Sequence, residues 1–326
     1  MVARQAHNLK VVGSNPTLAT LNMNSDLFKI TLDTISLSAI SCYKAIGMQD
    51  KYMADKIATQ IMREVLNSSN LGFKIIIGEG ELDQAPMLYN GEILGKGNVD
   101  YDIAVDPLDG TNLCAKAKNG AITTIAISQK DSIMKMPEVY MYKMASHLVH
   151  DKNILNINDS ISNNLQNLSK YLKKNIADIG VCILERERHD DIVKAVIASG
   201  AKTYMITDGD VMGVLNTYYL SDKIHIYIGI GGSPEGVLSA AGIKSLGGFF
   251  QCKFIDDEDK YVGFFDKNKI YNENDLIAKD VIFAISFVTD SILNGIQKIN
   301  DKYVVNSIIV NSLDKIENKI TTCYPE

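Results

Sequence analysis

The sequence predicts an α/β protein in which helical and sheet layers alternate, and three features indicate this class. Apolar runs at 75–77 and 103–105 suit buried strands, and turn residues follow each run. Ahead of them, residues 26–43 and 51–67 are expected to form helices. Residues 179–206 have the pattern of a strand, a helix and a second strand. Helices and strands therefore alternate along the chain.

Boundaries follow from turn residues and periodicity. Pro107 and Gly110 are expected to end the strand at 103–105, and Gly200 to end the helix at 189–199. His189 would then be a helix-start residue rather than a catalytic base. A glycine-rich turn leads into a helix at Glu235. Further strands are expected at 120–128, 179–184, 201–206 and 224–228, and tail strands at 281–288 and 304–310 would complete a sheet.

Composition indicates an ordinary globular protein. The 326 residues are 46% hydrophobic and 22% charged, enough for one large unit or two closely packed halves. The net charge of -6 predicts no general attraction to nucleic acid or to anionic membranes. The five cysteines include no C-x-x-C pair, which argues against zinc and disulfides and favours a reducing cytoplasm.

Two segments stand apart from the rest. Residues 1–22 lack periodicity and read like the translation of an upstream transfer-RNA gene, so we expect the native chain to be 23–326. A short mitochondrial-type presequence is the alternative. Residues 151–169 are rich in Asn, Asp and Ser, and we expect a soft internal boundary there.

The motif D-P-L-D-G-T is the centre of the predicted site. It places Asp106, Asp109 and Thr111 at the end of a strand, where oxygen atoms converge on a hard divalent cation. An acidic surface turn is the alternative, since Asp, Pro and Gly are common in turns.

A second acidic group has the same layout and favours the metal interpretation. Glu79, Glu81 and Asp83 follow the apolar run at 75–77. So many carboxylates close together repel unless cations neutralise them. A pair of Mg²⁺ or Mn²⁺ ions meets that need.

Four motifs together resemble class II fructose-1,6-bisphosphatases, within the lithium-sensitive, metal-dependent sugar phosphatases. They are G-E-G-E-L-D-Q-A-P-M-L-Y at 78–89, V-D-P-L-D-G-T at 105–111, D-G-D at 208–210 and G-I-G-G-S-P-E-G-V at 229–237. The resemblance begins near Met23 and weakens after about Lys253. It implies a layered αβαβα fold of two closely packed halves, with the metal site where they meet.

The resemblance also implies a reaction and a set of residues. The reaction is hydrolysis of fructose 1,6-bisphosphate in gluconeogenesis, with two or more Mn²⁺ or Mg²⁺ ions. Thr111, helped by Asp83 or Asp55, would orient water, and Lys51 would stabilise developing charge. The implied metal ligands are Asp55, Glu79, Asp106, Asp109 and Glu235.

Substrate binding would combine two arginines with sugar-binding groups. Arg186 and Arg188 suit the distal phosphate, because guanidinium groups fork onto phosphate oxygens. Glu187 stands where relatives often have proline, and it adds negative charge. The implied contacts are Asp109, Gly110, Thr111, Tyr140, Arg186, Glu187, Arg188, Asp208, Gly209, Asp210 and Gly232. Asp50 is expected only to cap the helix at 51–67, and a core tyrosine is the alternative for Tyr140.

Three alternatives remain open. Instead of a bisphosphatase specific for fructose 1,6-bisphosphate, the chain could be one that also accepts sedoheptulose 1,7-bisphosphate. It could also be an inositol monophosphatase or an inactive sugar-phosphate sensor. The inositol alternative gives no role to Arg186 and Arg188. We expect a cytoplasmic homo-oligomer that acts on a small sugar bisphosphate, without nucleic-acid or membrane partners.

Overall fold

The computed structural model describes residues 25–80, 87–255, 263 and 265–326. They form two compact units. Unit 1 contains the described residues up to Ile133 and those from Lys279 onward, and unit 2 runs from Met134 to Ala278. The Asn/Asp/Ser-rich stretch at 151–169 lies inside unit 2.

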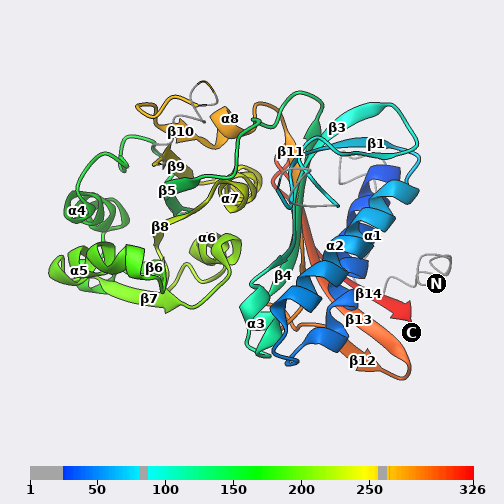
Figure 1. Cartoon of the computed structure of the whole chain (residues 1–326). Helices are drawn as coiled ribbons and strands as arrows, with labels where there is room; N and C mark the ends of the chain where they lie inside the picture. The colour runs from blue at the N-terminus through cyan, green and yellow to red at the C-terminus, as the bar shows by residue number, and fades with distance from the viewer. Residues whose placement is uncertain (1–24, 81–86, 256–262, 264) are drawn as a thin grey trace. The chain divides into compact units, whose positions relative to one another are not determined.

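In the described part of unit 1, eight strands form one mixed sheet (Figure 1). β1 and β3 are parallel, whereas β4, β11 and β13 pair antiparallel with their neighbours. The tail thus completes this sheet, as predicted. The order is β12-β13-β11-β4-β3-β1-β2, with β14 on β13. The strands are β1 Gly72–Ile77, β2 Ile93–Gly95, β3 Val99–Asp109, β4 Ile122–Gln129, β11 Val281–Phe287, β12 Gln297–Ile299, β13 Lys302–Asn311 and β14 Glu317–Pro325.

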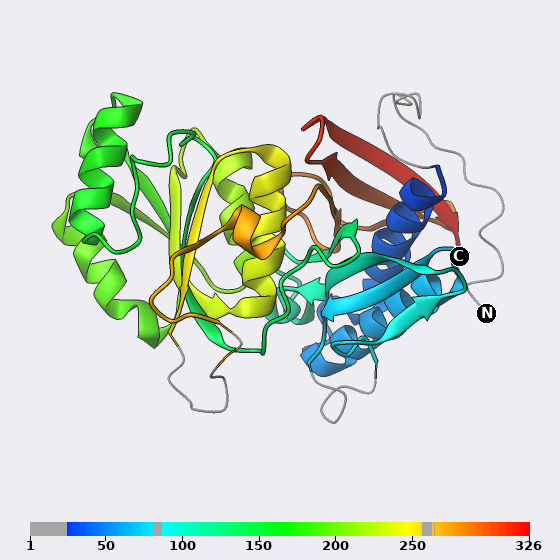
Figure 2. The same ribbon diagram turned by 90° about the horizontal axis from the view of Figure 1, so that it is seen from above.

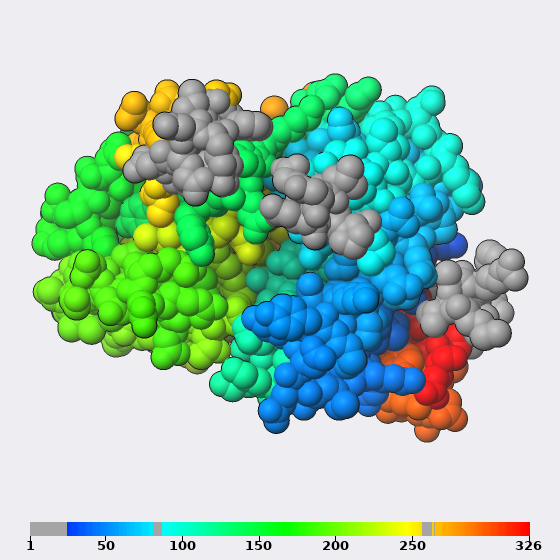
Figure 3. Space-filling model, in the orientation of Figure 1, coloured from blue at the N-terminus to red at the C-terminus, as the bar shows by residue number. Residues whose placement is uncertain are grey.

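Two long helices cover one face of this sheet. They are α1 (Ser25–Ser41) and α2 (Lys51–Ser68), joined through the short 3-10 helix η3 (Tyr43–Ala45). Asp50 caps α2, because its Oδ1 accepts the Met53 N–H at 3.0 Å. The outer side of α2 lies on the molecular surface (Figure 3). Both predicted helices are confirmed within two residues at each end.

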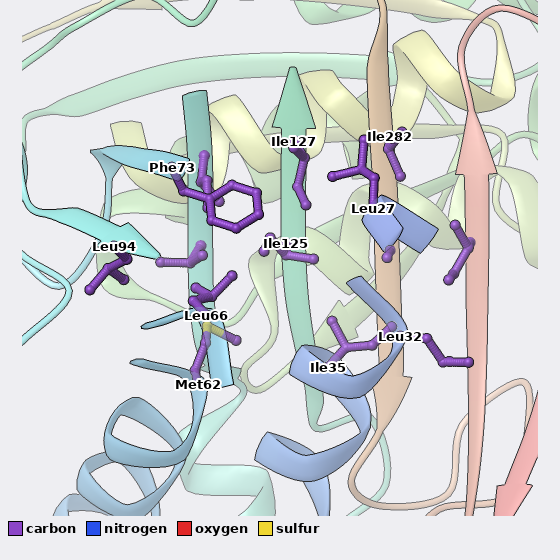
Figure 4. Close-up of a cluster of buried hydrophobic side chains, with 14 of the residues drawn as sticks. Leu27, Leu32, Ile35, Met62, Leu66, Phe73, Leu94, Ile125, Ile127 and Ile282 are labelled. Atoms are coloured by element: carbon purple, nitrogen blue, oxygen red, sulfur yellow. The ribbon is translucent and has the colours of Figure 1, made fainter. Parts of the chain in front are cut away.

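The core of unit 1 lies between these helices and the sheet (Figure 4). Met62 and Leu66 of α2 and Phe73 of β1 have no solvent-exposed surface. Burying each such side chain contributes about 1.5–3 kcal/mol. The other labelled side chains come from α1, β2, β4 and β11: Leu27, Leu32, Ile35, Leu94, Ile125, Ile127 and Ile282.

The described part of unit 2 contains a six-stranded sheet in the order β10-β9-β5-β8-β6-β7. β6, β7 and β8 are parallel, and β5 is antiparallel to β8. The predicted strand-helix-strand unit is confirmed as β6, α5 and β7, and Gly200 has a left-handed φ of 81°. The strands are β5 Tyr140–Ser146, β6 Gly180–Leu184, β7 Lys202–Ile206, β8 Ile226–Gly232, β9 Phe249–Phe254 and β10 Tyr271–Asn272.

Helices cover both faces of this sheet (Figure 2). α4 (Ile161–Leu172) and α5 (Asp190–Ala198) pack on one face. α6 (Asp210–Tyr219) and α7 (Ser233–Leu246) pack on the other. The described residues of unit 2 also form the helices η4 Ile176–Asp178, η5 Glu187–His189 and α8 Glu273–Leu276. Unit 1 therefore supplies a helical layer on a sheet, and unit 2 a sheet between two helical layers, which confirms the α/β class.

The end of β3 differs from the prediction. The strand does not stop before Pro107 but continues to Asp109. A register shift against β4 lies between Asp106 and Asp109, and proline is tolerated at such a bulge because its missing N–H leaves no ladder bond unmade. No helix among the described residues combines the length and hydropathy that a membrane span requires.

Candidate active site

In unit 1, three predicted metal ligands lie at or just beyond the carboxyl ends of two neighbouring strands. Glu79 lies two residues beyond β1, and Asp106 and Asp109 are in the last part of β3. Since β1 and β3 are parallel, their carboxyl ends lie at the same edge of the sheet. The topology thus brings these carboxylates to one edge, as the sequence predicted.

The bulge at the end of β3 sets the direction of its side chains. Asp106 Oδ1 accepts the Leu108 N–H at 3.0 Å, and Asp109 is only 5% exposed. Gly110 follows with a left-handed φ of 87° and occupies the N-cap of α3 (Thr111–Ala115). Thr111 is therefore the first residue of α3 and not its cap.

The turn that carries Glu79 is hydrogen-bonded to residues 88–90. The Glu79 N–H donates to the Leu88 carbonyl at 2.9 Å, and the Gly78 N–H donates to Asn90 Oδ1 at 3.0 Å. A side chain at Gly78 would overlap the Leu88 carbonyl oxygen. Glycine is required there for this approach. Asp83 and Glu81 lie outside the described residues.

Helix α2 carries Lys51 and Asp55 one turn apart, so both lie on one side of the helix. Lys51 is its first residue, with Nζ 5.1 Å from the centroid of the Tyr52 ring. Asp55 is partly buried, and burial raises the pKa of its carboxyl group. A cation beside Asp55 would favour the charged form instead.

The chemistry of these donors fits a hard divalent cation, because all are carboxylate oxygens. Among the described residues, no three His, Cys, Asp or Glu side chains are gathered closely enough to hold a metal as they stand. Asp83, one of the predicted catalytic carboxylates, is outside that set.

In unit 2, the predicted substrate-binding residues also share one sheet edge. Arg186 and Arg188 follow β6, and Asp208 follows β7. Gly232 ends β8 and lies opposite Tyr140, the first residue of the antiparallel β5. The carboxyl ends of parallel strands are the usual binding edge in α/β sheets.

The two arginines at this edge have different partners. Arg186 Nη1 donates to the Thr207 carbonyl at 2.7 Å, and its Nη2 pairs with Asp208 at 3.1 Å. The exposed Arg188 donates from Nε to the Ile230 carbonyl at 3.0 Å. Its guanidinium carbon lies 5.1 Å from the centroid of the Tyr140 ring, a cation–π contact.

Neighbours of the arginines have clearer roles. Tyr140 is 51% exposed, which argues against a core role for it. Glu187 is exposed between the arginines. His189 is buried, its Nδ1 lies 2.6 Å from the Leu184 carbonyl, and its Nε2 accepts the Ile230 N–H at 2.8 Å. Both ring nitrogens thus bond the backbone, which agrees with a helix-start residue.

Asp210 is more enclosed than the sequence suggested. It is the first residue of α6, after Gly209 with a φ of 85°, and is 7% exposed. Lys143 Nζ donates to its Oδ2, and the Tyr227 hydroxyl donates to its Oδ1. Neither Lys143 nor Tyr227 was among the residues predicted from the sequence. A lysine inside the apolar strand Y-M-Y-K-M-A was a usable signal, because a buried lysine needs a charged partner.

Glu235 lies in the first turn of α7. Its Oε2 is buried and finds no hydrogen-bond partner among the described residues. A side chain at Gly232 would overlap that oxygen. Burial raises the pKa of Glu235, while Lys143 opposes the shift and Asp210 adds to it. A buried carboxylate oxygen without a donor fits the predicted metal-ligand role.

Residues 22–324 match the family model described as bacterial fructose-1,6-bisphosphatase, glpX-encoded. The chain belongs to this family. Its members are metal-dependent phosphatases.

Curated relatives agree with the assignment. D-fructose 1,6-bisphosphatase class 2/sedoheptulose 1,7-bisphosphatase 2 of Acaryochloris marina is 33% identical over 326 residues, which cover 90% of this chain and 93% of the relative. D-fructose 1,6-bisphosphatase class 2/sedoheptulose 1,7-bisphosphatase of Prochlorococcus marinus strain MIT 9301 is 35% identical over 324 residues, covering 93% and 97%. The resemblance stated from the motifs is confirmed.

Proposed function

We propose that this chain hydrolyses the 1-phosphate of fructose 1,6-bisphosphate, giving fructose 6-phosphate and phosphate, with Mn²⁺ or Mg²⁺. The observation that carries the proposal is the placement of Glu79, Asp106 and Asp109 at the same edge of the sheet, in a chain of this family. The oxygen donors suit either ion.

In unit 1, Asp55, Glu79, Asp106 and Asp109 would hold metal, and in unit 2 Glu235 would do so. When bound, such ions neutralise phosphate charge and promote attack by water. Thr111 orients the attacking water, with Asp83 as the assisting carboxylate. Lys51 stabilises the charge that develops on the reacting phosphate.

In unit 2, Arg186 and Arg188 bind the distal phosphate. The local cations matter because the whole chain has a net charge of -6. Tyr140, Asp208, Gly209, Asp210 and Gly232 bind the sugar, and Asp109, Gly110 and Thr111 bind the reacting end. Glu187 weakens binding of the anion through like charge.

A second substrate has specific support. Both curated relatives carry sedoheptulose 1,7-bisphosphatase in their names. A seven-carbon bisphosphate presents the same two anions, so Arg186 and Arg188 retain their role. Inositol monophosphate lacks the second phosphate. The inactive-sensor alternative is disfavoured because every proposed carboxylate and Thr111 is present in the chain.

Phosphate release by the purified protein tests the proposal. After removal of metal with a chelator, Mn²⁺ or Mg²⁺ is added back with fructose 1,6-bisphosphate, sedoheptulose 1,7-bisphosphate or inositol monophosphate. We expect metal-dependent release from one or both bisphosphates and little from the inositol ester. Absence of release from fructose 1,6-bisphosphate with either metal overturns the proposal. Measurement of the molecular mass in solution tests the proposed homo-oligomer. The proposed location is the cytoplasm, and the free cysteines support it because a reducing compartment keeps thiols unpaired.

A further inference from the structure

Lys143, Asp210 and Tyr227 form a buried polar group in unit 2, here named the Asp210 cluster. Its members come from β5, α6 and β8, and Lys143 and Tyr227 have no exposed surface. An ammonium group and a hydroxyl group donate to different oxygens of the same carboxylate. Two separate strands thus fix the orientation of Asp210.

The backbone around the cluster is shaped to hold it. Gly229 and Gly231 lie on the same face of β8 as Tyr227, since side chains alternate along a strand. A Cβ at Gly231 would overlap Asp210 Oδ2, and one at Gly229 would lie 2.7 Å from the Tyr227 hydroxyl. A Cβ at Gly236 of α7 would overlap Met141 Sδ and approach Lys143. These glycines of the G-I-G-G-S-P-E-G motif therefore make room for the cluster.

Stability alone is a poor reason for such a cluster. A buried ion pair commonly adds no more stability than apolar side chains of similar volume. The location of the cluster offers a better reason, because Asp210 begins α6 at the edge that carries Arg186 and Asp208. A carboxylate has about four acceptor positions, so it can accept from more donors than Lys143 and Tyr227.

We propose that Lys143 and Tyr227 are positioning residues for sugar recognition. They hold the Asp210 carboxylate in one orientation, in which it accepts hydrogen bonds from hydroxyl groups of a phosphorylated sugar. This inference rests on the proposed function, because it needs Asp210 to contact substrate. It adds two residues that do not contact the substrate themselves.

Tyr227→Phe tests the inference, because it removes one hydroxyl group and keeps the ring. We expect KM for fructose 1,6-bisphosphate to rise about tenfold, as for a lost hydrogen bond to a charged group, with kcat within about twofold. Hydrolysis of 4-nitrophenyl phosphate, which has no sugar hydroxyl groups, should stay at the wild-type rate. Tyr142→Phe is the matched control, since Tyr142 is on the opposite face of β5 and packs with the α4 and α5 side chains. It should leave both activities unchanged.

A double variant shows whether Tyr227 acts through Asp210. In an Asp210→Asn background, Tyr227→Phe should raise KM by clearly less than it does alone, because the carboxylate it orients is gone. The same comparison with Lys143→Met in place of Tyr227→Phe tests the lysine. The melting temperature of each variant shows whether it still folds. Additive effects on KM, an unchanged KM in Tyr227→Phe, or equal losses with both substrates overturn the inference.

If the wild-type protein releases no phosphate from fructose 1,6-bisphosphate, the proposed function fails instead. In that case, calorimetry of fructose 6-phosphate binding tests the inference by itself. Weaker binding by Tyr227→Phe than by the wild type supports it, and equal binding overturns it.

Discussion

At the scale of single residues, Thr111 and Arg188 have different proposed roles: Thr111 orients the attacking water, and Arg188 binds the distal phosphate. Thr111 follows two carboxylates at the end of β3, and Gly110 rather than Thr111 caps α3. Arg188 is exposed at the edge of the other sheet and stacks on Tyr140. Substitution at these two positions should therefore separate kcat from KM.

Thr111→Ala removes the hydroxyl group and leaves Asp106 and Asp109 unchanged. If the hydroxyl group orients water, kcat should fall on the order of 10²-fold or more, while KM and metal affinity stay near wild type. Thr111→Ser should retain much of the activity. Steady-state kinetics of the two variants measure this, and a nearly intact kcat in Thr111→Ala would remove Thr111 from catalysis.

Arg188→Ala should chiefly raise KM for the bisphosphate. A lost charge-assisted hydrogen bond costs about 1.5–3 kcal/mol, and the effect on kcat should be smaller. Lys194→Ala is a matched control, because Lys194 forms an exposed ion pair with Asp191 on α5. Losses in kcat with unchanged KM would instead place Arg188 at the reacting phosphate.

At the scale of elements, parallel strand pairs explain how distant motifs come together. β1 with β3 brings the predicted carboxylates of unit 1 to one sheet edge, and β6 with β7 and β8 does the same for the proposed substrate-binding residues of unit 2. The opposite ends of these strands serve packing. There, buried His225 precedes β8, and its Nδ1 accepts the Gly180 N–H of β6 at 2.9 Å.

His225 should make folding stability depend on pH. Its pKa is lowered from 6.5 mainly by burial, with a contribution from Lys174. Below 6.5 the unfolded chain binds a proton that the folded chain does not, so stability is full above 6.5 and declines as pH falls through the folded pKa. His225→Asn, whose Oδ1 can replace the acceptor, should reduce this decline in denaturant unfolding between about pH 7 and 5. A decline in His225→Asn equal to that of the wild type would contradict the assignment.

At the scale of the whole molecule, the family match covers residues 22–324 and so includes both units. The chain of unit 1 is interrupted by unit 2 between Ile133 and Lys279. β11 and β13 return to the first sheet after that insertion. The tail is therefore needed to build the sheet that carries the carboxylates.

Removal of residues 1–22 should leave activity and melting temperature nearly unchanged. The segment lacks periodicity, so it is expected to contribute little to a packed core. Thermal unfolding and phosphate release of the shortened and full chains measure this. A clear loss of either property would show that the segment docks on the rest of the chain.

The sequence by itself determined much of the fold and the candidate site. Apolar runs placed the strands that carry Glu79 and Asp106, because burial favours those runs wherever the chain folds. Glycine and proline marked the turns, since their backbone restrictions are local. Motif resemblance identified the family and the implied ligands before any geometry.

Only the tertiary structure decided which polar side chains meet across distant elements. Lys143 and Tyr227 lie 67 and 17 positions from Asp210. The pairing of β5 with β8 and the packing of α6 on both strands bring all three together. The continuation of β3 through Pro107 likewise depends on its register with β4. Strand pairing and burial set these contacts, and both depend on residues far away in the chain.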